Sequence, residues 1–122
     1  LPKDPDASAR RIREEVLRQA GFRIAVIITD TWGRPWREGL TNVAIGASGM
    51  EVLKDYRGTQ DPHGHELHAT AIAVADELAA AAELVMGKVD KIPAAIIRGY
   101  PYLPAGGTIR GLIRGQDWDL YR

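Results

Sequence analysis

One run of residues is almost continuously apolar and β-branched: Arg23-Ile24-Ala25-Val26-Ile27-Ile28-Thr29-Asp30. A short run of this kind is typical of a strand that is covered on both faces. We expect this strand to stop at Asp30. A weaker strand is predicted at Asn42-Val43-Ala44-Ile45-Gly46 and a third at Ala94-Ala95-Ile96-Ile97-Arg98. If the strands are neighbours, Arg98 ends near Asp30 at one edge of the sheet.

Two helices are predicted around these strands. The first covers residues 7–20, with Asp6 as its N-cap and Gly21 ending it. The second and longest covers residues 67–86, which are rich in Ala and Leu, and is closed by Gly87 and Lys88. Residues 58–65 have turn chemistry, and residues 108–114 form a strand or a turn of helix. The order of elements favours an α+β or α/β fold, a mixed sheet with the Ala-rich helix packed on it.

Composition limits the class of protein. The 122 residues contain sixteen Lys+Arg, sixteen Asp+Glu and no Cys, with 45% hydrophobic residues. This is the composition of one ordinary globular domain, 1–122, without the global charge that attracts nucleic acid or an anionic membrane. Disulfides and thiolate chemistry are excluded, and no apolar run reaches the roughly 20 residues that span a bilayer. We therefore expect a cytoplasmic protein.

The segment after the first strand carries the most chemistry, Thr29-Asp30-Thr31-Trp32-Gly33-Arg34-Pro35-Trp36-Arg37-Glu38-Gly39. Asp30 can hold a hard divalent cation, Gly33 lets backbone N–H groups approach an anion, and Arg34 or Arg37 can bind phosphate or carboxylate. The alternative is structural: Asp30 caps the loop, the arginines pair with acids such as Glu38, and the tryptophans pack.

Three further sets of residues are candidates. His63, His65 and His68 with Glu66 resemble a metal cluster, although histidines in a Gly/Pro-rich loop are also typical of a solvated turn. Asp76 and Glu77 are candidate catalytic carboxylates on a helix that otherwise offers a packing surface, which can lie across a dimer interface. Arg98 can add positive charge to an anion site or close a salt bridge.

Several of these motifs, in this order, resemble the coenzyme F-420:L-glutamate ligases. The similarity lies in Asp30-Thr31-Trp32-Gly33-Arg34-Pro35-Trp36-Arg37, Thr41-Asn42-Val43-Ala44-Ile45-Gly46, Arg57-Gly58-Thr59, Asp61-Pro62-His63-Gly64 and the helix from Val74 to Lys88. The similarity extends over nearly the whole chain. The chain also resembles the corresponding N-terminal domain of the two-domain actinobacterial enzymes.

The resemblance implies a GTP-dependent ligase. Such an enzyme activates a terminal carboxylate of the deazaflavin coenzyme precursor as an acyl phosphate, and the amine of L-glutamate attacks it, building a γ-linked oligoglutamate tail. Mg²⁺ or Mn²⁺ is expected as cofactor and a homodimer as the assembly. The resemblance makes Asp30 a metal ligand and Gly33 a nucleotide contact. Arg34, Arg37, Thr41 and Asn42 line the site, and Thr31 belongs to the same motif.

Two departures from the family pattern bear on activity. The family often carries a carboxylate just after the position of Thr70, but Ala71 follows here. A complete metal site then needs Asp76, Glu66 or a backbone carbonyl instead. The family's ligases are also considerably longer, so we expect a central fragment or separate domain that does not ligate alone. The alternatives are a non-catalytic binding or dimerisation module derived from the ligase and a histidine-based zinc hydrolase.

Overall fold

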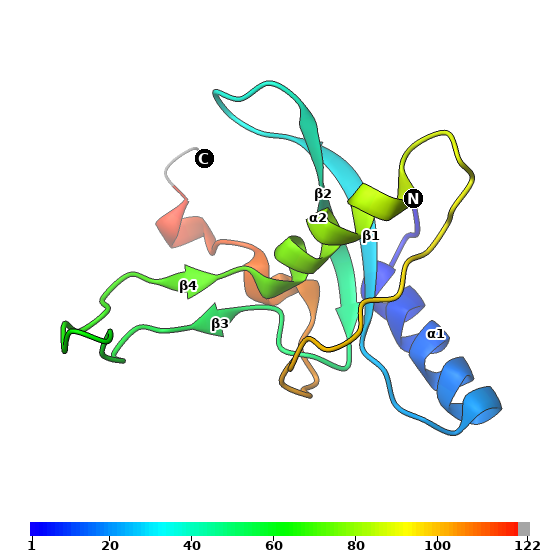
Figure 1. The fold of residues 1–122 in the computed structure, drawn as a ribbon, viewed down its shortest axis with the longest axis horizontal. Coiled ribbons are helices and arrows are strands. Elements are labelled where there is room, and N and C mark those ends of the chain that lie inside the picture. Colours follow the sequence, from blue (N-terminus) through cyan, green and yellow to red (C-terminus); the bar gives the residue numbers. More distant parts are fainter. Residues whose placement is uncertain (120–122) are drawn as a thin grey trace.

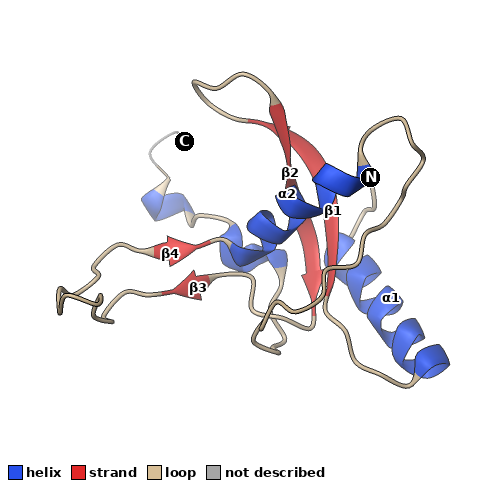
Figure 2. Cartoon of the chain, viewed as in Figure 1, coloured by secondary structure: helices blue, strands red, loops and turns tan. Residues whose placement is uncertain are grey.

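The computed structural model describes residues 1–119 and has an α+β fold (Figures 1 and 2). The elements in chain order are α1 (Pro5–Ala20), β1 (Val26–Gly33), β2 (Leu40–Ser48), β3 (Lys54–Asp55), β4 (Ala71–Ile72), α2 (Val74–Met86) and two short 3₁₀ helices, η1 (Ile109–Leu112) and η2 (Gln116–Trp118). The α+β prediction is confirmed. Within the described residues the strands form two antiparallel pairs, β1 with β2 and β3 with β4, in place of one mixed sheet.

Helix α1 begins two residues earlier than predicted. The carboxylate of Asp4, not that of Asp6, accepts a hydrogen bond from Ala7 N at 2.9 Å and caps the helix, and proline occupies the first turn. At the other end Gly21 has φ 77° and donates to the Leu17 carbonyl at 3.0 Å, as predicted. Asp6 joins distant segments instead, because its Oδ1 accepts from the amides of Ala47 (2.8 Å) and Ile109 (3.1 Å).

The β1–β2 hairpin forms the centre of the fold. Both predicted strands exist, but β1 begins at Val26 instead of Arg23 and continues past Asp30 to Gly33, and β2 is nine residues long. Pairing across the hairpin supplies backbone partners to residues whose own strand propensity is low, which explains the extension. The register shifts between Ile28 and Thr29, where β2 carries one extra residue, Ile45.

Because of that bulge, residues of β2 pack against α2 on one side and against α1 on the other. Ala44 and Ala47 are three residues apart, yet both pack in the core cluster with Ala75 of α2. Gly46 faces the opposite side, where a Cβ would lie 2.5 Å from the Cβ of Pro5 in α1. The two helices therefore cover opposite faces of the hairpin, and small residues permit the close approach. Ile27, Val52, Ile109 and Leu112 complete the core around Ala75.

The predicted helix over residues 67–86 is wrong in its first seven residues. Strand β4 occupies positions 71–72 and pairs with β3, so α2 begins only at Val74 and is shorter than α1. Cross-strand pairing has overridden the helical propensity of these residues. The predicted turn at 58–65 is confirmed, with Gly64 at φ 84° donating to the Asp61 carbonyl at 3.0 Å. Residues 53–72 form an arm that projects from the body in Figure 1.

The third predicted strand is also wrong. Residues 94–98 carry no regular secondary structure and pair with no strand of the described chain. Residues 108–114 contain η1, so the helical alternative predicted there is the correct one. Among residues 1–119, no helix is both long enough and apolar enough to cross a membrane.

Candidate functional site

The hairpin sorts its polar residues onto two faces. Residues alternate along β1, and Ile27 packs in the core beside α2, so Thr29 and Thr31 also face α2. Asp30 and Trp32 face the other way. The strand that the sequence singled out thus carries two separate polar surfaces, one on either side.

On the α2 side, Asn42 is the centre of a hydrogen-bonded group of five residues. The members of this group, which we call the Asn42 cluster, are Thr29, Thr31, Asn42, Glu83 and Lys88. The Asn42 side chain is 4% exposed, so it needs partners within the protein. Its Nδ2 donates to Glu83 Oε2 at 2.7 Å and to Thr29 Oγ1 at 3.4 Å. Its Oδ1 accepts from Thr31 Oγ1 at 3.2 Å.

Lys88 connects this cluster to solvent. Its Nζ lies 3.0 Å from Glu83 Oε1, 2.6 Å from Thr31 Oγ1 and 3.2 Å from Asn42 Oδ1. The side chain of Lys88 is 56% exposed and that of Glu83 is 22% exposed. An ammonium group held by neutral oxygens and one carboxylate, and open on its outer side, can also bind a phosphate or carboxylate oxygen of a ligand.

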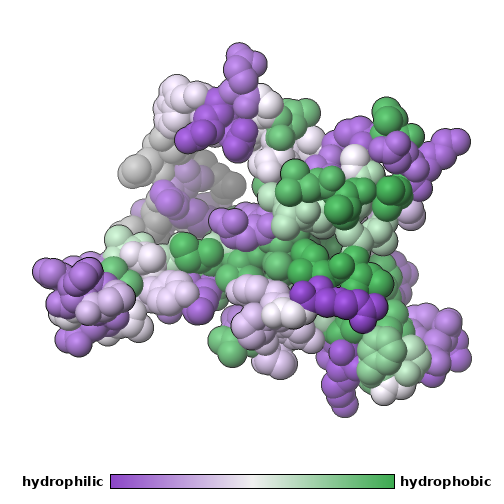
Figure 3. Space-filling view, viewed as in Figure 1, coloured by the Kyte–Doolittle hydropathy of each residue, from purple (hydrophilic) through white to green (hydrophobic). Residues whose placement is uncertain are grey.

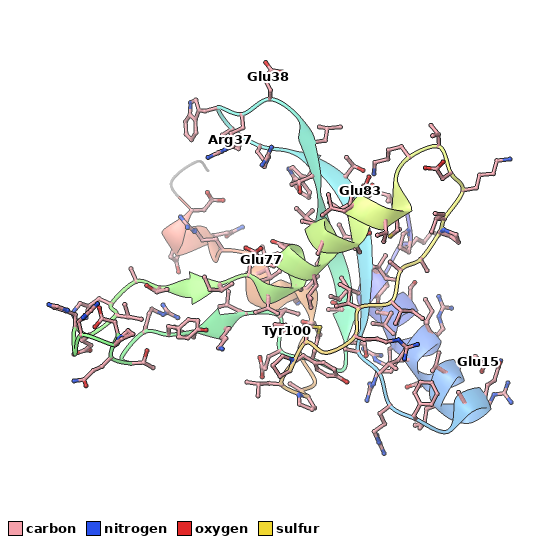
Figure 4. All side chains as sticks on the ribbon, viewed as in Figure 1. Glu15, Arg37, Glu38, Glu77, Glu83 and Tyr100 are labelled. Atoms are coloured by element: carbon pink, nitrogen blue, oxygen red, sulfur yellow. The ribbon has the colours of Figure 1, made fainter. Side chains whose placement is uncertain are left out.

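The end of helix α2 places Glu83 and Lys88 beside the hairpin. Gly87, at φ 58°, stops the helix and donates to the Glu83 carbonyl at 3.0 Å, so Lys88 immediately turns back toward β1. Figure 4 shows Glu83 on the last turns of α2, alongside the hairpin. Sequence reasoning missed Glu83 and assigned Lys88 only to the helix end. The available signal was an acidic residue near the end of an Ala-rich helix, one turn before the closing Gly87 and Lys88.

On the opposite face, Asp30 is half-buried, and its carboxylate forms no hydrogen bond or ion pair with the described residues. Its cross-strand partner is Val43, and the next pair along this face is Trp32 with Thr41. A carboxylate with no partner among residues 1–119 is available to a cation. Residues 1–119 contain no group of three or more His, Cys, Asp or Glu side chains that can hold a metal ion by itself.

The tip of the hairpin carries the predicted arginines. Arg34 Nη2 donates to the Glu38 carbonyl at 3.1 Å, which closes the loop between the strands. Arg37 and Glu38 extend from the tip in Figure 4. Gly33 is exposed, and a Cβ placed there would meet only Leu40 Cδ2, at 4.0 Å, so its backbone is open to a ligand.

The remaining candidates lie elsewhere. Asp76 Oδ1 accepts from the amide of Ala44 at 2.9 Å, beside the bulge, so this carboxylate supports the hairpin. Glu77 is exposed on the first turn of α2 (Figure 4). Thr70 and Ala71 belong to the arm: the Thr70 carbonyl accepts from Tyr56 N, and Ala71 pairs with Asp55. Strands β3 and β4 of the arm form a sheet separate from β1–β2, and in Figure 1 the arm points away from the hairpin.

The histidines occupy the same arm and do not converge. His65 Nδ1 lies 3.6 Å from Asp61 Oδ2 and His68 Nδ1 lies 3.7 Å from Glu66 Oε1. Both imidazoles are about four-fifths exposed. They therefore form a solvated turn, and the interpretation as a metal cluster is wrong for the described part of the chain. Arg98 is exposed and is the last residue of the irregular segment that stands in place of the third predicted strand.

Asp55 and Arg57 form an ion pair on the arm. Arg57 Nε donates to Asp55 Oδ1 at 2.8 Å and the backbone amide of Arg57 donates to the same oxygen at 2.9 Å. The guanidinium bond, followed by the amide bond, lowers the pKa of Asp55 from 3.8 to about 2. Because the pair is exposed, it fixes the local turn without offering a buried reactive group.

Comparisons of the amino-acid sequence with known proteins place this chain in a family. Residues 1–99 match the family described as F420-0:Gamma-glutamyl ligase. Proteins named Coenzyme F420:L-glutamate ligase are 48% identical in Methanothermobacter thermautotrophicus, 47% in Methanocaldococcus jannaschii and 50% in Methanopyrus kandleri. Each alignment covers all of this chain and 49–50% of the relative, so the chain spans about half the length of the relatives it matches. The chain therefore belongs to the F420-0:gamma-glutamyl ligase family.

Proposed function

We propose that the protein containing this chain ligates L-glutamate to the precursor of coenzyme F420 at the expense of GTP. The observation that carries this proposal is the identity of 46–50% over the whole chain to proteins named for that ligation. The hairpin supports it, because β1 carries the Asp30 carboxylate and the exposed Gly33, and the solvent-facing Lys88 reaches Thr31 of the same strand from the end of α2.

In the proposed reaction, a terminal carboxylate oxygen of the precursor attacks the γ-phosphorus of GTP, and GDP leaves. The glutamate nitrogen then attacks the acyl carbon, loses a proton and expels orthophosphate, which leaves an amide. All of these reactants are anionic, so catalysis depends on positioning them and on compensating their charge.

The residues of this chain divide that task between the two faces of β1. Lys88, held by Thr31 and Glu83, supplies positive charge on the α2 face. Gly33, at the strand end, lets phosphate oxygens approach the backbone from either side. Asn42 holds Thr31 and Glu83 in place, so we assign it a positioning role beside the nucleotide.

The described residues offer too few ligands to hold a divalent cation alone, so the nucleotide would have to supply the others through its phosphates. Mg²⁺ commonly binds one or two protein carboxylates and completes its shell with phosphates and water. Asp30 offers one such carboxylate, on the face of β1 away from α2. When bound, Mg²⁺ or Mn²⁺ neutralises phosphate charge. With Asp76 bound to the Ala44 amide, we propose no second carboxylate ligand from α2.

The residue roles are tested by assaying ligation with the full-length protein and single variants. Asp30→Asn is expected to abolish turnover and to weaken magnesium-dependent GTP binding while leaving the unfolding curve unchanged. Lys88→Ala is expected to lower kcat/KM by on the order of 10²-fold, because one charge-compensating donor is lost. Lys3→Ala removes an exposed lysine at the other end of the chain and serves as the matched control.

If Asp30→Asn and Lys88→Ala both retain full activity, the hairpin does not contain the ligation site. A folded protein that binds neither GTP nor metal would favour the second candidate, a non-catalytic binding or dimerisation module. The exposed apolar end of α2, with Leu84 88% exposed, is the observation that favours it. Homodimerisation remains part of the proposal and is measured separately, by sedimentation.

A further inference from the structure

The segment after α2 contains a strand-like sequence without strand partners. Residues 89–99 form no backbone hydrogen bond with any part of the described chain. In Figure 1 the segment leaves the end of α2, loops out and returns toward the lower end of the hairpin. Backbone amides and carbonyls without protein partners must either be hydrated or pair with another chain segment, because burying them unpaired costs free energy.

The side chains of this segment are apolar on both sides. Ile96 is 79% exposed and Ile97 is 45% exposed. Adjacent residues of a strand point to opposite faces, so a strand containing both isoleucines needs cover on each face. Leu84, Val85 and Val89 extend the same exposed apolar surface to the end of α2. Figure 3 shows apolar residues gathered across the face of the molecule where α2 and this segment lie.

The whole chain exposes more surface than a compact protein of its size. Its accessible surface is 9573 Å² for 13.4 kDa. A compact monomer of that mass exposes about 6,500 Å², so the excess is about 3,000 Å². Burying that area on this chain and a similar area on a partner gives roughly 6,000 Å², which is at or beyond the top of the range for permanent complexes. Part of the excess belongs to the projecting arm, and the remainder is large enough for a permanent interface, which resembles a domain core cut in half.

We propose that residues 94–98 are an interior strand that pairs with extended, apolar polypeptide from the half of the ligase that this chain does not span. The relatives supply a comparable length of chain beyond the aligned region. A second copy of residues 1–122 fits less well. Pairing the segment with its own copy gives it one neighbour strand, and it leaves the other edge and one isoleucine face uncovered.

Hydrogen exchange of residues 94–98 tests this strand. The probe is a chimera in which these 122 residues replace the aligned half of the Methanopyrus kandleri relative. Amides 95–98 are expected to exchange on the order of 1,000-fold more slowly in the chimera than in the 122-residue chain alone. The natural relative, measured over its aligned segment, provides the same comparison should the chimera not fold.

A charged substitution tests the apolar cover. Ile97→Lys in the chimera is expected to remove the protection of residues 94–98. Phe22→Lys, at an apolar residue of similar exposure beyond the surface just described, is expected to leave it intact. Fast exchange in both the chimera and the natural relative overturns the proposal. It is equally overturned if the 122-residue chain dimerises by itself and protects these amides. Neither readout requires GTP or turnover, so a failed ligation assay leaves this result unaffected.

Discussion

Replacing Asn42 by alanine tests whether the Asn42 cluster holds α2 against the hairpin. The amide is buried, donates to the Glu83 carboxylate at 2.7 Å and accepts from Thr31 and Lys88 at 3.2 Å each. A hydrogen bond to a charged group is worth about 1.5–3 kcal/mol and a neutral one about 0.5–1.5 kcal/mol. Glu83 keeps its ion pair with Lys88, which offsets part of the loss. We therefore expect the free energy of unfolding to fall by about 2–4 kcal/mol.

The assay is urea unfolding followed by circular dichroism, with Gln60→Ala as the control for removing an exposed amide. The control is expected to change the free energy of unfolding by less than about 0.5 kcal/mol. A double-mutant cycle of Asn42→Ala with Glu83→Gln isolates the coupling between the two side chains. If Asn42→Ala costs no more than the control, the cluster does not stabilise the hairpin–helix contact and the reasoning is refuted.

Three other perturbations follow from the packing and the charges. Gly46→Ala places a methyl group against the first turn of α1 and is expected to destabilise the protein by about 1–3 kcal/mol, whereas Gly106→Ala, with open space around it, is expected to be nearly neutral in the same unfolding measurement. Asp76→Ala leaves the amide at the bulge without its acceptor and is expected to cost about 1–3 kcal/mol; an unchanged unfolding midpoint contradicts that role. Asp55 has a lowered pKa, so its pairing stabilises the arm above pH 3.8 and is lost as the pH falls toward 2. Arg57→Ala removes the guanidinium but keeps the backbone amide that also bonds Asp55, so the pKa is expected to rise from about 2 toward 3.8 without reaching it in an NMR titration; a midpoint that stays near 2 would show that the guanidinium is not the main cause.

Local sequence predicted those elements whose determinants are local. The first helix has a cap, a proline and a terminal glycine within its own sequence, and only the capping aspartate, and with it the first two helical residues, were wrong. The two strands of the hairpin were found from their β-branched residues. Their full length was not, because it depends on pairing between residues up to 22 positions apart, such as Val26 and Ser48.

The errors arose where distant pairing competes with local propensity. Residues 67–73 have helical composition, but β4 is held by β3 across the turn. Residues 94–98 have strand composition, but the described chain contains no strand beside them. In both segments the secondary structure depends on whether a partner strand is present, and local propensity contains no information about that partner.

The candidate site was predicted in part for the same reason. The motif from Asp30 to Arg37 located the hairpin, and Thr31 and Asn42 do meet there. Alternation along β1 then separates Asp30 from them, which requires knowing that the strand continues past Asp30. Glu83 and Lys88 join the site only because α2 ends beside the hairpin, a tertiary fact that no short motif contains.

The most direct test of the central claim is intact-mass analysis of the coenzyme precursor after incubation with the full-length protein, L-glutamate, GTP and Mg²⁺. The account predicts products heavier by one or more glutamyl residues, formed only when GTP is present and absent with Asp30→Asn. A folded, full-length protein that adds no glutamate under these conditions, or adds it equally well without GTP, would contradict the account.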